Sequence, residues 1–406
     1  MAVSVDPVIS NIFFTLGLIP HIMKKKDGYY SPGSTGNPDS YPLVTILIPL
    51  YREPYRFIHS LSSCLLAQTY DHKKMELIFI TEPDDDETNR YVEKIVRNIK
   101  TEFASVRLLV TDGREKMKPY ALNHGMNYCN GEIIGIYDAE CKPEKQQIEK
   151  AICAIFEQDY DLVQTKIEVV SENVLGEFCK LDIYSWTENL LPLINEKARS
   201  FPLGTKGLFI KKECLDEIGG FPLHLTEDAM MTILLASRNK KFGLVDSVTH
   251  ETSTKAWSTH FRQRRRWFRG YLSCLFSLIK AEIPVKRKLW LSIPYISPLL
   301  CTATLFGFFF LFLYFITWYF NPAMTYIAPW METVLYDSGI FYWSLFLGYV
   351  GLPITLFSYL LLIADRPLED RAWYVYLIPL YWMFVGVAAV SSFFKDTKNW
   401  DKTMRN

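Results

Sequence analysis

The chain has 406 residues, of which 49% are hydrophobic, 15% aromatic and 22% charged. This balance excludes a disordered or collagen-like chain and is typical of one sizeable soluble domain joined to a membrane part. The 44 basic and 44 acidic residues cancel, so the overall charge gives no indication of nucleic-acid binding, and we predict no nucleic-acid partner. The eight cysteines form no Cys-x-x-Cys pair, which is typical of reduced, buried thiols in a cytosolic domain.

The first 40 residues combine an apolar segment with a linker. Residues 7–23 contain no Lys, Arg, Asp or Glu and precede three consecutive lysines. The segment is slightly shorter than the about 20 residues that cross a bilayer, so a tilted span, a re-entrant segment and an interfacial anchor all remain open. Residues 27–40 are rich in Gly, Pro and Ser, which is typical of a linker. We therefore assign residues 1–40 to a membrane-associated or interfacial segment and its linker.

Residues 41–272 alternate short β-rich runs with amphipathic helical patterns, which indicates an α/β layered domain. We predict strands at residues 44–49, 76–81, 106–110, 133–137 and 161–165, and helices at residues 55–68, 89–103 and 143–157. Ligands of such sheets bind beyond the carboxyl ends of the strands. Polar residues directly after each strand are therefore the candidates for a binding site.

Two carboxylates, Asp138 and Glu140, follow the apolar run at 133–137. In an extended segment, residues two apart point the same way, so this pair is suited to hold a hard divalent cation and, through it, a diphosphate. A solvated acidic turn is the alternative interpretation of the same pattern.

A second acidic pair, Glu227 and Asp228, follows Thr226 at the start of an apolar helical pattern. Helix N-termini favour carboxylates, and Thr226 is placed to cap the helix, so a purely structural role is a serious alternative. A carboxylate held there is also suited to accept a proton from an attacking hydroxyl. Asp228 is our candidate for that base, with Glu227 as the neighbouring alternative.

A cationic and aromatic cluster, Gln263, Arg266 and Trp267, lies shortly before the chain turns hydrophobic. This combination is typical of an acceptor site for a sugar polymer at a membrane. A juxtamembrane patch attracted to anionic lipid head groups is the alternative. Residues 273–289 are assigned to an interfacial helix or linker.

Three hydrophobic stretches follow, at residues 290–320, 341–364 and 372–394, and each is long enough to cross a bilayer. We predict three transmembrane helices, the first of them kinked or delayed by Pro294 and Pro298. The chain is accordingly predicted to be an integral membrane protein that contacts membrane lipids.

The loops between these stretches predict orientation. Residues 321–340 contain no Lys or Arg, whereas the next loop contains Arg366 and Arg371. The positive-inside rule then places the soluble domain in the cytosol. Three crossings would place the tail at residues 395–406 outside the cell, yet the tail carries four basic residues, which favour the cytosolic side. The side of the tail therefore stays open.

Taken in order, the pair Asp138 and Glu140, the pair Glu227 and Asp228 and the run that ends at Trp267, followed by membrane helices, resemble the processive family-2 glycosyltransferases. These include the synthases of cellulose, hyaluronan, chitin oligosaccharides and glucomannan. The specificity of the resemblance comes from the ordered triple rather than from any single motif.

Two further segments resemble this family. Residues 48–53 resemble its opening nucleotide-binding strand and turn, and residues 116–123 resemble its Lys-Pro-x-x-Leu-Asn segment. The resemblance thereby assigns five residues to the donor-binding site: Pro49, Tyr51, Glu53, Lys118 and Asn123.

The resemblance implies an α/β domain of the GT-A fold and an inverting transfer from a nucleotide diphosphate sugar. It implies that Asp138 and Glu140 hold Mg or Mn on the diphosphate and that Asp228 is the general base. The chemistry agrees, because the charge growing on the leaving diphosphate must be neutralised and the incoming hydroxyl must lose a proton.

The resemblance also assigns the acceptor side. Trp267 would offer a flat apolar face to the terminal sugar of the acceptor, and Gln263 and Arg266 would form hydrogen bonds near the acceptor and the diphosphate. Residues 201–207 resemble the Gly-Thr loops of glucan and mannan synthases, which assigns Gly204 and Thr205 to this side. That loop favours UDP-glucose or GDP-mannose over an N-acetylated donor, although an ordinary turn is the alternative.

Residues 82–88 differ from the Asp-Asp-Gly-Ser type turn that binds the base in many members of this family. We predict that Glu82 and Asp84 contact the base, with a solvated acidic loop as the alternative.

Three functions compete on the sequence. The first is a polymer synthase that extrudes its product through its own helices, and the second adds one sugar to a membrane lipid. The third is an inactive membrane protein that binds a nucleotide sugar. A glycan or lipid-linked acceptor is expected for the first two, and a homo-oligomer or an accessory secretion subunit is an expected partner of the first.

Overall fold

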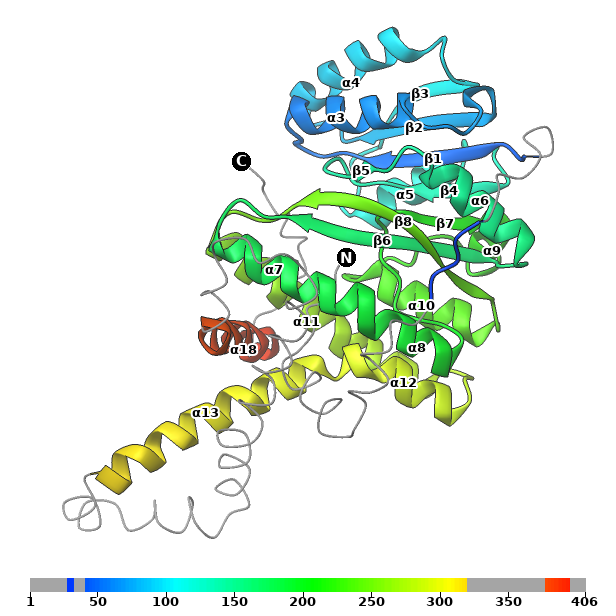
Figure 1. Cartoon of the computed structure of the whole chain (residues 1–406). Coiled ribbons are helices and arrows are strands. Elements are labelled where there is room, and N and C mark those ends of the chain that lie inside the picture. The colour runs from blue at the N-terminus through cyan, green and yellow to red at the C-terminus, as the bar shows by residue number, and fades with distance from the viewer. Residues whose placement is uncertain (1–27, 33–40, 320–376, 395–406) are drawn as a thin grey trace.

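The computed structural model describes residues 28–32, 41–319 and 377–394. In this part of the chain, helices pack on both faces of an eight-stranded mixed sheet with the strand order β3-β2-β1-β4-β7-β6-β8-β5 (Figure 1). The strands are β1 Val44–Pro49, β2 Met75–Thr81, β3 Ser105–Val110, β4 Ile133–Ile136, β5 Lys142–Pro143, β6 Leu162–Val170, β7 Leu208–Lys211 and β8 Phe242–Thr252.

The N-terminal half of the sheet is parallel, as its apolar runs predict. β1 pairs in parallel with β2 and β4, and β2 pairs in parallel with β3. Side chains of β1 alternate between two hydrophobic cores, because Leu47 packs in one core whereas Ile46 and Ile48 pack in the other. Both faces of this half are therefore buried, and polar side chains are available only at the strand ends.

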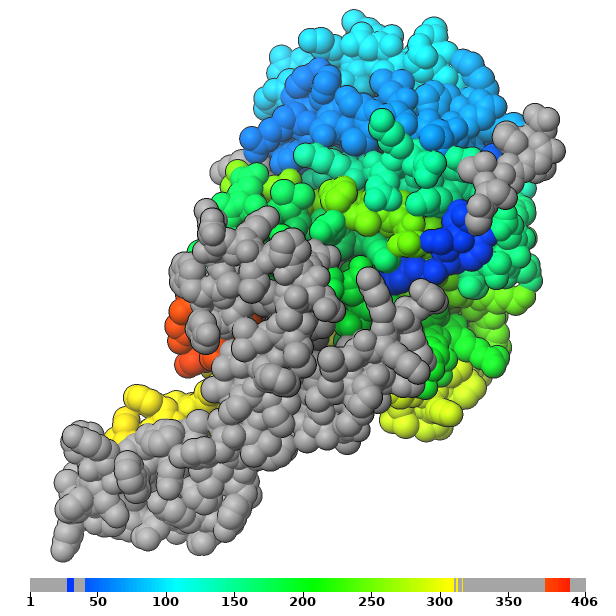
Figure 2. Space-filling model, in the orientation of Figure 1, coloured from blue at the N-terminus to red at the C-terminus, as the bar shows by residue number. Residues whose placement is uncertain are grey.

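The C-terminal half of the sheet contains strands that the sequence did not predict. β7 lies antiparallel between β4 and β6, and β8 runs parallel to β6. β6 extends five residues beyond the predicted 161–165 segment, to Val170, because β8 pairs with it along its length. The short segment at residues 28–32 lies on β8, where the Tyr30 amide donates to the Leu244 carbonyl at 2.7 Å (Figure 2).

The helices of the α/β domain are α3 Tyr55–Leu66, α4 Asp86–Ile99, α5 Lys118–Met126, α6 Gln147–Glu157, α7 Val174–Tyr184, α8 Leu191–Ala198, α9 Lys212–Glu217 and α10 Glu227–Ser237. Two of them begin elsewhere than predicted. α4 begins three residues early because the Asp85 side chain accepts a hydrogen bond from the Thr88 amide and caps it. α6 begins late because Lys142 and Pro143 pair with β8 as β5.

In the described part of the chain after the sheet, the helices are α11 Trp257–Lys280, α12 Val285–Tyr295, α13 Ser297–Tyr319 and α18 Ile378–Phe394. The predicted stretch at 290–320 is divided at Ile296, where α12 and the segment Ser297–Phe309 meet at 53°. The bend falls between Pro294 and Pro298, where a kink was expected.

Within the described residues, no single helix is both long and apolar enough to cross a membrane, and only the bent pair α12 and α13 meets those criteria together. The predicted segments at residues 7–23 and 341–364 and the tail lie outside the described residues, as does the start of the third predicted span.

Candidate active site

A cavity of about 510 Å³ lies beyond the carboxyl ends of the strands. Its wall includes Pro49, Tyr51 and Glu53 after β1, and Glu82 after β2. Residues from α5, α10 and α11 close the cavity. Because the carboxyl ends of β1, β2 and β4 lie at one edge of the sheet, side chains far apart in the sequence meet here.

The acidic pair after β4 lies on the cavity wall, and each carboxylate has its own lysine. Asp138 forms an ion pair with Lys118, whose ammonium also donates to Thr205 Oγ1 at 2.6 Å. Glu140 forms an ion pair with Lys206 at 3.0 Å, and the same ammonium contacts Glu251. Asp138 and Glu140 line the same cavity at the turn that follows β4, and the Glu140 side chain is buried.

Lys118 remains a cation in this setting. Burial alone would lower its pKa, but the charges of Asp138 and Glu227 outweigh burial, so the pKa lies above its ordinary value. A protonated lysine beside Asp138 therefore provides a positive charge on the cavity wall.

The carboxylates of Asp138 and Glu140 are hard oxygen donors suited to Mg²⁺ or Mn²⁺. Among the described residues, three possible ligands gather within 4.8 Å only at Asp161, Glu213 and Cys214, which do not line the cavity. Two carboxylates alone do not complete the coordination of such an ion. The pair therefore fits a metal that takes its remaining ligands from a bound phosphate and water.

Glu227, the first residue of α10, lies on the cavity wall and is buried. Burial, together with the charge of Asp228, raises the pKa of Glu227 to about 7 against the opposing charges of Lys118 and Arg266. This carboxyl group therefore exchanges its proton near neutral pH.

Asp228 is equally buried but does not line the cavity. One of its oxygens accepts a hydrogen bond from the Ala229 amide at 2.8 Å. Its charge acts on His224 and on Tyr271 of α11, so the carboxylate lies near the helix that carries Trp267. Arg266 of the same helix is influenced by both acidic neighbours, and Glu227 also acts on Lys118.

Thr226 occupies the N-cap position of α10, but the prediction that its side chain caps the helix is wrong. The hydroxyl instead lies 3.2 Å from His224 Nδ1. A Cβ on Gly270 of α11 would stand 2.4 Å from Thr226 Cγ2, so glycine permits α11 to pack against the start of α10. This close approach brings the acidic pair of α10 to the cationic run of α11.

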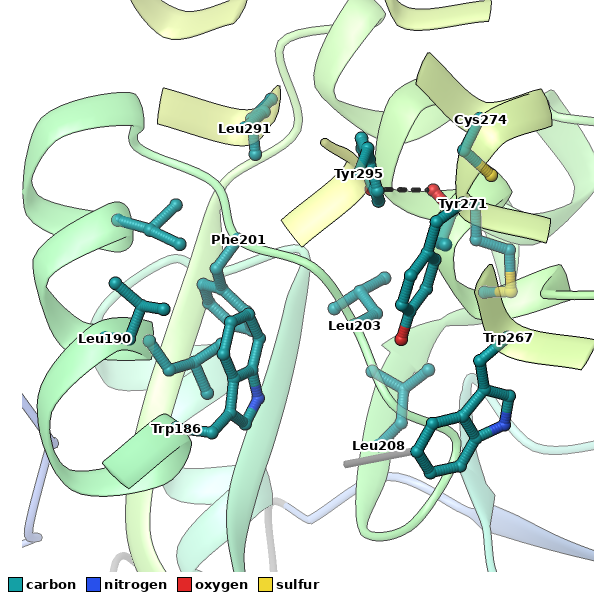
Figure 3. Packing of buried hydrophobic residues seen from close by; sticks show 14 of the residues in the cluster. Trp186, Leu190, Phe201, Leu203, Leu208, Trp267, Tyr271, Cys274, Leu291 and Tyr295 are labelled. Atoms are coloured by element: carbon teal, nitrogen blue, oxygen red, sulfur yellow. Dashed lines mark hydrogen bonds between the residues drawn. The ribbon is translucent and has the colours of Figure 1, made fainter. Parts of the chain in front are cut away.

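The predicted residues of that run, Gln263, Arg266 and Trp267, all line the cavity. Arg266 Nη1 donates to the Leu225 carbonyl at 3.1 Å, which fixes the guanidinium beside Glu227 and Asp228. Figure 3 shows Trp267 and Tyr271, four residues apart on α11, with their rings directed toward Leu203 and Leu208. These side chains are turned inward, so a lipid-facing patch does not describe them.

Arg264, in the same run, belongs to a buried polar network that joins α11 to α7 and α18. Its Nη2 lies 3.2 Å from Asp182 Oδ2, and its Nε donates to His260 at 3.1 Å. Tyr381 of α18 donates to the same Asp182 oxygen at 2.7 Å. The Arg264 guanidinium also lies over the Trp267 ring, 4.8 Å from its centre. Burial raises the pKa of Asp182 to about 6 against the influence of Arg264 and Tyr381.

Tyr381→Phe is expected to lower the free energy of unfolding by about 1.5–3 kcal/mol, because a buried carboxylate loses a hydrogen bond. Thermal unfolding of the full chain measures the effect. Tyr120→Phe is the matched control, since the Tyr120 hydroxyl makes a bond of similar length to the exposed carboxylate of Asp112 (2.6 Å). Equal losses in the two variants would contradict docking of α18 through Tyr381.

The predicted base-binding residues lie around the turns after β1 and β2. Glu82 lines the cavity, accepts a hydrogen bond from Thr111, and has a pKa raised by burial. Asp84 does not line the cavity. Lys116, which hydrogen-bonds to Asp84, holds the pKa of that carboxyl below its usual range, and Tyr51 Oη donates to it at 3.3 Å. Asp84 therefore holds two residues of the cavity wall, Tyr51 and Lys116, through hydrogen bonds from outside that wall.

Two further predicted residues have bracing positions outside the cavity wall. Asn123 exchanges two 2.7 Å hydrogen bonds with the backbone of Phe221. The Gly204 amide donates to Gln164 Oε1 at 3.0 Å, which fixes the loop that presents Thr205. Asn123 and Gly204 do not line the cavity, so their positions do not support the predicted direct contact with a ligand.

The sequence interpretation missed several residues of the wall, notably Arg52, Lys206, Glu251 and Arg264. Lys206 lies next to Thr205 in the loop that was recognised by its resemblance to Gly-Thr loops, and the lysine itself was assigned no role. Glu251 lies near the end of β8, where buried and partly buried residues alternate. This alternation was the feature that could have identified the strand.

Comparison with known proteins adds a family match. A model of the family described as "Glycosyltransferase like family 2" matches residues 42–270, more than half of the chain. Glycosyltransferase AglE of Haloferax volcanii is 26% identical over 185 residues, which cover 45% of this chain and 57% of AglE. The beta-monoglucosyldiacylglycerol synthase of Synechocystis sp. is 22% identical over 260 residues, which cover 61% of this chain and 52% of that protein. The chain thus spans a little over half the length of these curated relatives.

Among solved structures, mannosyltransferase PcManGT from Pyrobaculum calidifontis, in complex with GDP-Man and Mn²⁺, is similar over almost the whole chain. The TM-score is 0.58 at 17% sequence identity, and the alignment covers 98% of this chain and 99% of that one. At this identity the similarity establishes the fold.

Proposed function

The chain belongs to glycosyltransferase-like family 2, and on that premise we propose that it transfers a neutral hexose from a nucleotide diphosphate sugar to a growing β-linked glycan at a membrane. It is a glycosyltransferase with an α/β domain of the GT-A fold. The observation that carries the proposal is the single cavity wall shared by Asp138, Glu140, Glu227 and the run that ends at Trp267.

The donor would lie along the ends of β1, β2 and β4. Tyr51 and Glu82 flank the part of the cavity that suits the base, and Lys118 and Arg266 supply positive charge for the diphosphate. UDP-glucose and GDP-mannose are the favoured donors, on the resemblance of the Gly-Thr loop. PcManGT was solved with GDP-Man and Mn²⁺, which supports a nucleotide diphosphate donor and a divalent cation for this fold.

Asp138 and Glu140 would hold Mg²⁺ or Mn²⁺. When bound, such an ion neutralises the charge that grows on the leaving diphosphate. Lys118 keeps the Asp138 carboxylate in place and remains charged beside it, so the chain itself contributes to the same neutralisation.

Asp228 is our proposed general base, on the resemblance, and its charge acts on Tyr271 of α11, the helix that carries the acceptor residues. Glu227 acts on Lys118 and Arg266, which suits a residue that positions these two cations. Since Glu227 is the one of the two on the cavity wall, it remains the direct rival for the role of base.

Trp267 supports a sugar acceptor. It is 6% exposed and lines the cavity, and its Nε1 has no hydrogen-bond partner among the described residues. A sugar that stacks on the ring would bury apolar C–H groups, and its hydroxyl oxygens can accept from a donor that lacks a partner.

Trp267→Ala is therefore expected to raise the KM for the acceptor at least about tenfold, a loss of about 1.4 kcal/mol, with little change in the KM for the donor. Initial rates measured while each substrate is varied separate the two constants. Trp267→Phe is the matched control, because it keeps a flat ring and fills most of the space. An equal rise in both KM values would indicate general damage to the cavity rather than loss of acceptor stacking.

We propose that the chain is an integral membrane protein with its catalytic domain in the cytosol. Exposed apolar side chains follow one another at Phe276, Ile279, Val285 and Leu289, among the basic residues Lys280, Lys286 and Lys288. Apolar side chains interleaved with lysines suit an interface with anionic lipid. Extrusion of the product through the chain's own helices, assisted by a homo-oligomer or an accessory subunit, belongs to the same proposal.

Transfer of one sugar to a membrane lipid is the second candidate. It is favoured by the similarity to the beta-monoglucosyldiacylglycerol synthase of Synechocystis sp.. The size of the product separates the two functions. The full chain in lipid vesicles, supplied with radiolabelled UDP-glucose or GDP-mannose and Mn²⁺, should yield a polymer that elutes at the void volume on gel filtration and is digested by a matching β-glycanase. A single labelled glycolipid would establish the second candidate instead.

A further inference from the structure

Lys206 is a buried lysine on the cavity wall, and the fold directs it there. It lies in the loop between α8 and β7, where its backbone carbonyl accepts a 2.6 Å hydrogen bond from Gln164 Nε2. The next residue, Gly207, has a φ of +67°, and a Cβ there would meet Thr165 Oγ1 at 2.0 Å. Only glycine tolerates this conformation so close to β6, so the loop has one well-defined path.

The ammonium of Lys206 lies between two carboxylates that belong to different elements. Glu140 Oε1 is 3.0 Å away, and Glu251 near the end of β8 contacts the same nitrogen. All three side chains are buried, and all three line the cavity. A buried ammonium persists only where carboxylates compensate it, and here one of those carboxylates is the proposed metal ligand Glu140.

Lys118 and Lys206 differ in this respect. Lys118 holds Asp138 and is tied to Thr205, so its second partner is a neutral hydroxyl. Lys206 has a carboxylate on either side, and it can give up Glu140 while it remains paired with Glu251. Glu251 thus provides an ion-pair partner that keeps the ammonium on the cavity wall when it leaves Glu140.

We infer that Lys206 is a resident cation that shares Glu140 with the divalent metal and contacts the phosphate of the donor once the metal is bound. The inference rests on the proposed function. A divalent ion at Glu140 repels a nearby ammonium, so Lys206 withdraws to Glu251 and to the negative charge that enters the cavity with the donor. Lysine suits this exchange because it is a compact charge on a flexible stem.

The inference predicts two opposite changes in Lys206→Met. Without the ammonium, Glu140 and Glu251 are uncompensated, so the affinity for Mn²⁺ alone should rise at least about tenfold. The affinity for UDP or GDP without metal should fall by a similar factor, because a phosphate-binding charge is lost. Electron paramagnetic resonance of free Mn²⁺ and titration calorimetry of the nucleotides measure these constants on the full chain, without turnover.

Three companion variants make the test specific. Lys206→Arg keeps the charge and should restore both affinities toward the wild type. Lys240→Met removes a lysine that pairs with Glu217 outside the cavity, and should change neither. If Lys206→Met does not fold, Glu251→Gln serves in its place: it removes a carboxylate that competes with Glu140 for Lys206, so the affinity for Mn²⁺ should fall.

The outcomes distinguish this inference from the proposed function. If the wild type binds Mn²⁺ and UDP or GDP, but Lys206→Met leaves both affinities unchanged, Lys206 does not share Glu140 and the inference alone fails. If the wild type binds neither Mn²⁺ nor either nucleotide, the proposed function itself is contradicted.

Discussion

Asp228→Asn is expected to lower turnover by about 10²–10⁴-fold, the usual contribution of a general base, while donor binding is retained. The substitution preserves the size of the side chain and removes its ability to accept the proton of the attacking hydroxyl. The charge of Asp228 acts on Tyr271 of α11, the helix that carries the acceptor residues, and its carboxylate does not line the cavity in which the donor would lie. Steady-state turnover and calorimetric titration of UDP or GDP, on the same preparation, measure the two properties.

Glu227→Gln is the matched variant, because it neutralises the adjacent carboxylate, which does lie on the cavity wall. We expect a smaller loss of turnover than in Asp228→Asn, since Lys118 and Arg266 keep their positive charges and lose only the negative charge of Glu227. The residual turnover of the two variants separates the two roles, and the dependence of rate on pH reports the ionisation of Glu227. The charge of Asp228 contributes to the raised pKa of Glu227, about 7, so Asp228→Asn should move that titration to lower pH.

The opposite pattern would overturn the assignment. If Glu227 is the base, Glu227→Gln abolishes turnover at every pH. Asp228→Asn then retains turnover, with the acidic limb of its rate profile displaced to lower pH because Glu227 ionises more readily.

The second large effect is expected from the acidic pair after β4. Glu140→Gln and Asp138→Asn should each lower turnover at least about 100-fold, because each removes an oxygen ligand from the metal that neutralises the leaving diphosphate. Mn²⁺ should also cease to strengthen the binding of UDP or GDP in these variants, as measured by calorimetry with and without the ion.

Asp159→Asn is the control for these substitutions, because Asp159 forms an exposed ion pair with Lys241 outside the cavity. Chelation of metal from the wild type with EDTA should match the loss seen in Glu140→Gln. Full turnover by the chelated wild type would contradict a metal at Asp138 and Glu140.

The strand ends were predictable from the sequence because burial leaves a strong local signal. The uninterrupted apolar residues of β1 require two covered faces, and the first polar residues after β1, β2 and β4 then have to meet at one edge of the sheet. The residue pattern predicts that Asp138 and Glu140 lie at a binding site, the resemblance adds Tyr51 and Glu82, and all four line the cavity.

The contacts that complete the cavity depend on topology rather than on local pattern. Lys206 meets Glu140 only because β7 inserts antiparallel beside β4, and behind the wall Arg264 is held by Asp182, which also accepts from Tyr381, 199 residues away. Which of two adjacent carboxylates faces the cavity depends on the rotation of α10 about its axis. That rotation is set by the packing of Gly270 against Thr226 and is not visible in the residue pattern.

The central claim is that the cavity binds a nucleotide diphosphate sugar and transfers its hexose. Release of free nucleoside diphosphate by the full chain in lipid, with Mn²⁺ and each of UDP-glucose, GDP-mannose, UDP-N-acetylglucosamine and UDP-galactose, tests it most directly. We expect release from UDP-glucose or GDP-mannose that is lost in Asp228→Asn. An absence of release from all four donors, or an equal rate in Asp228→Asn, would contradict the account.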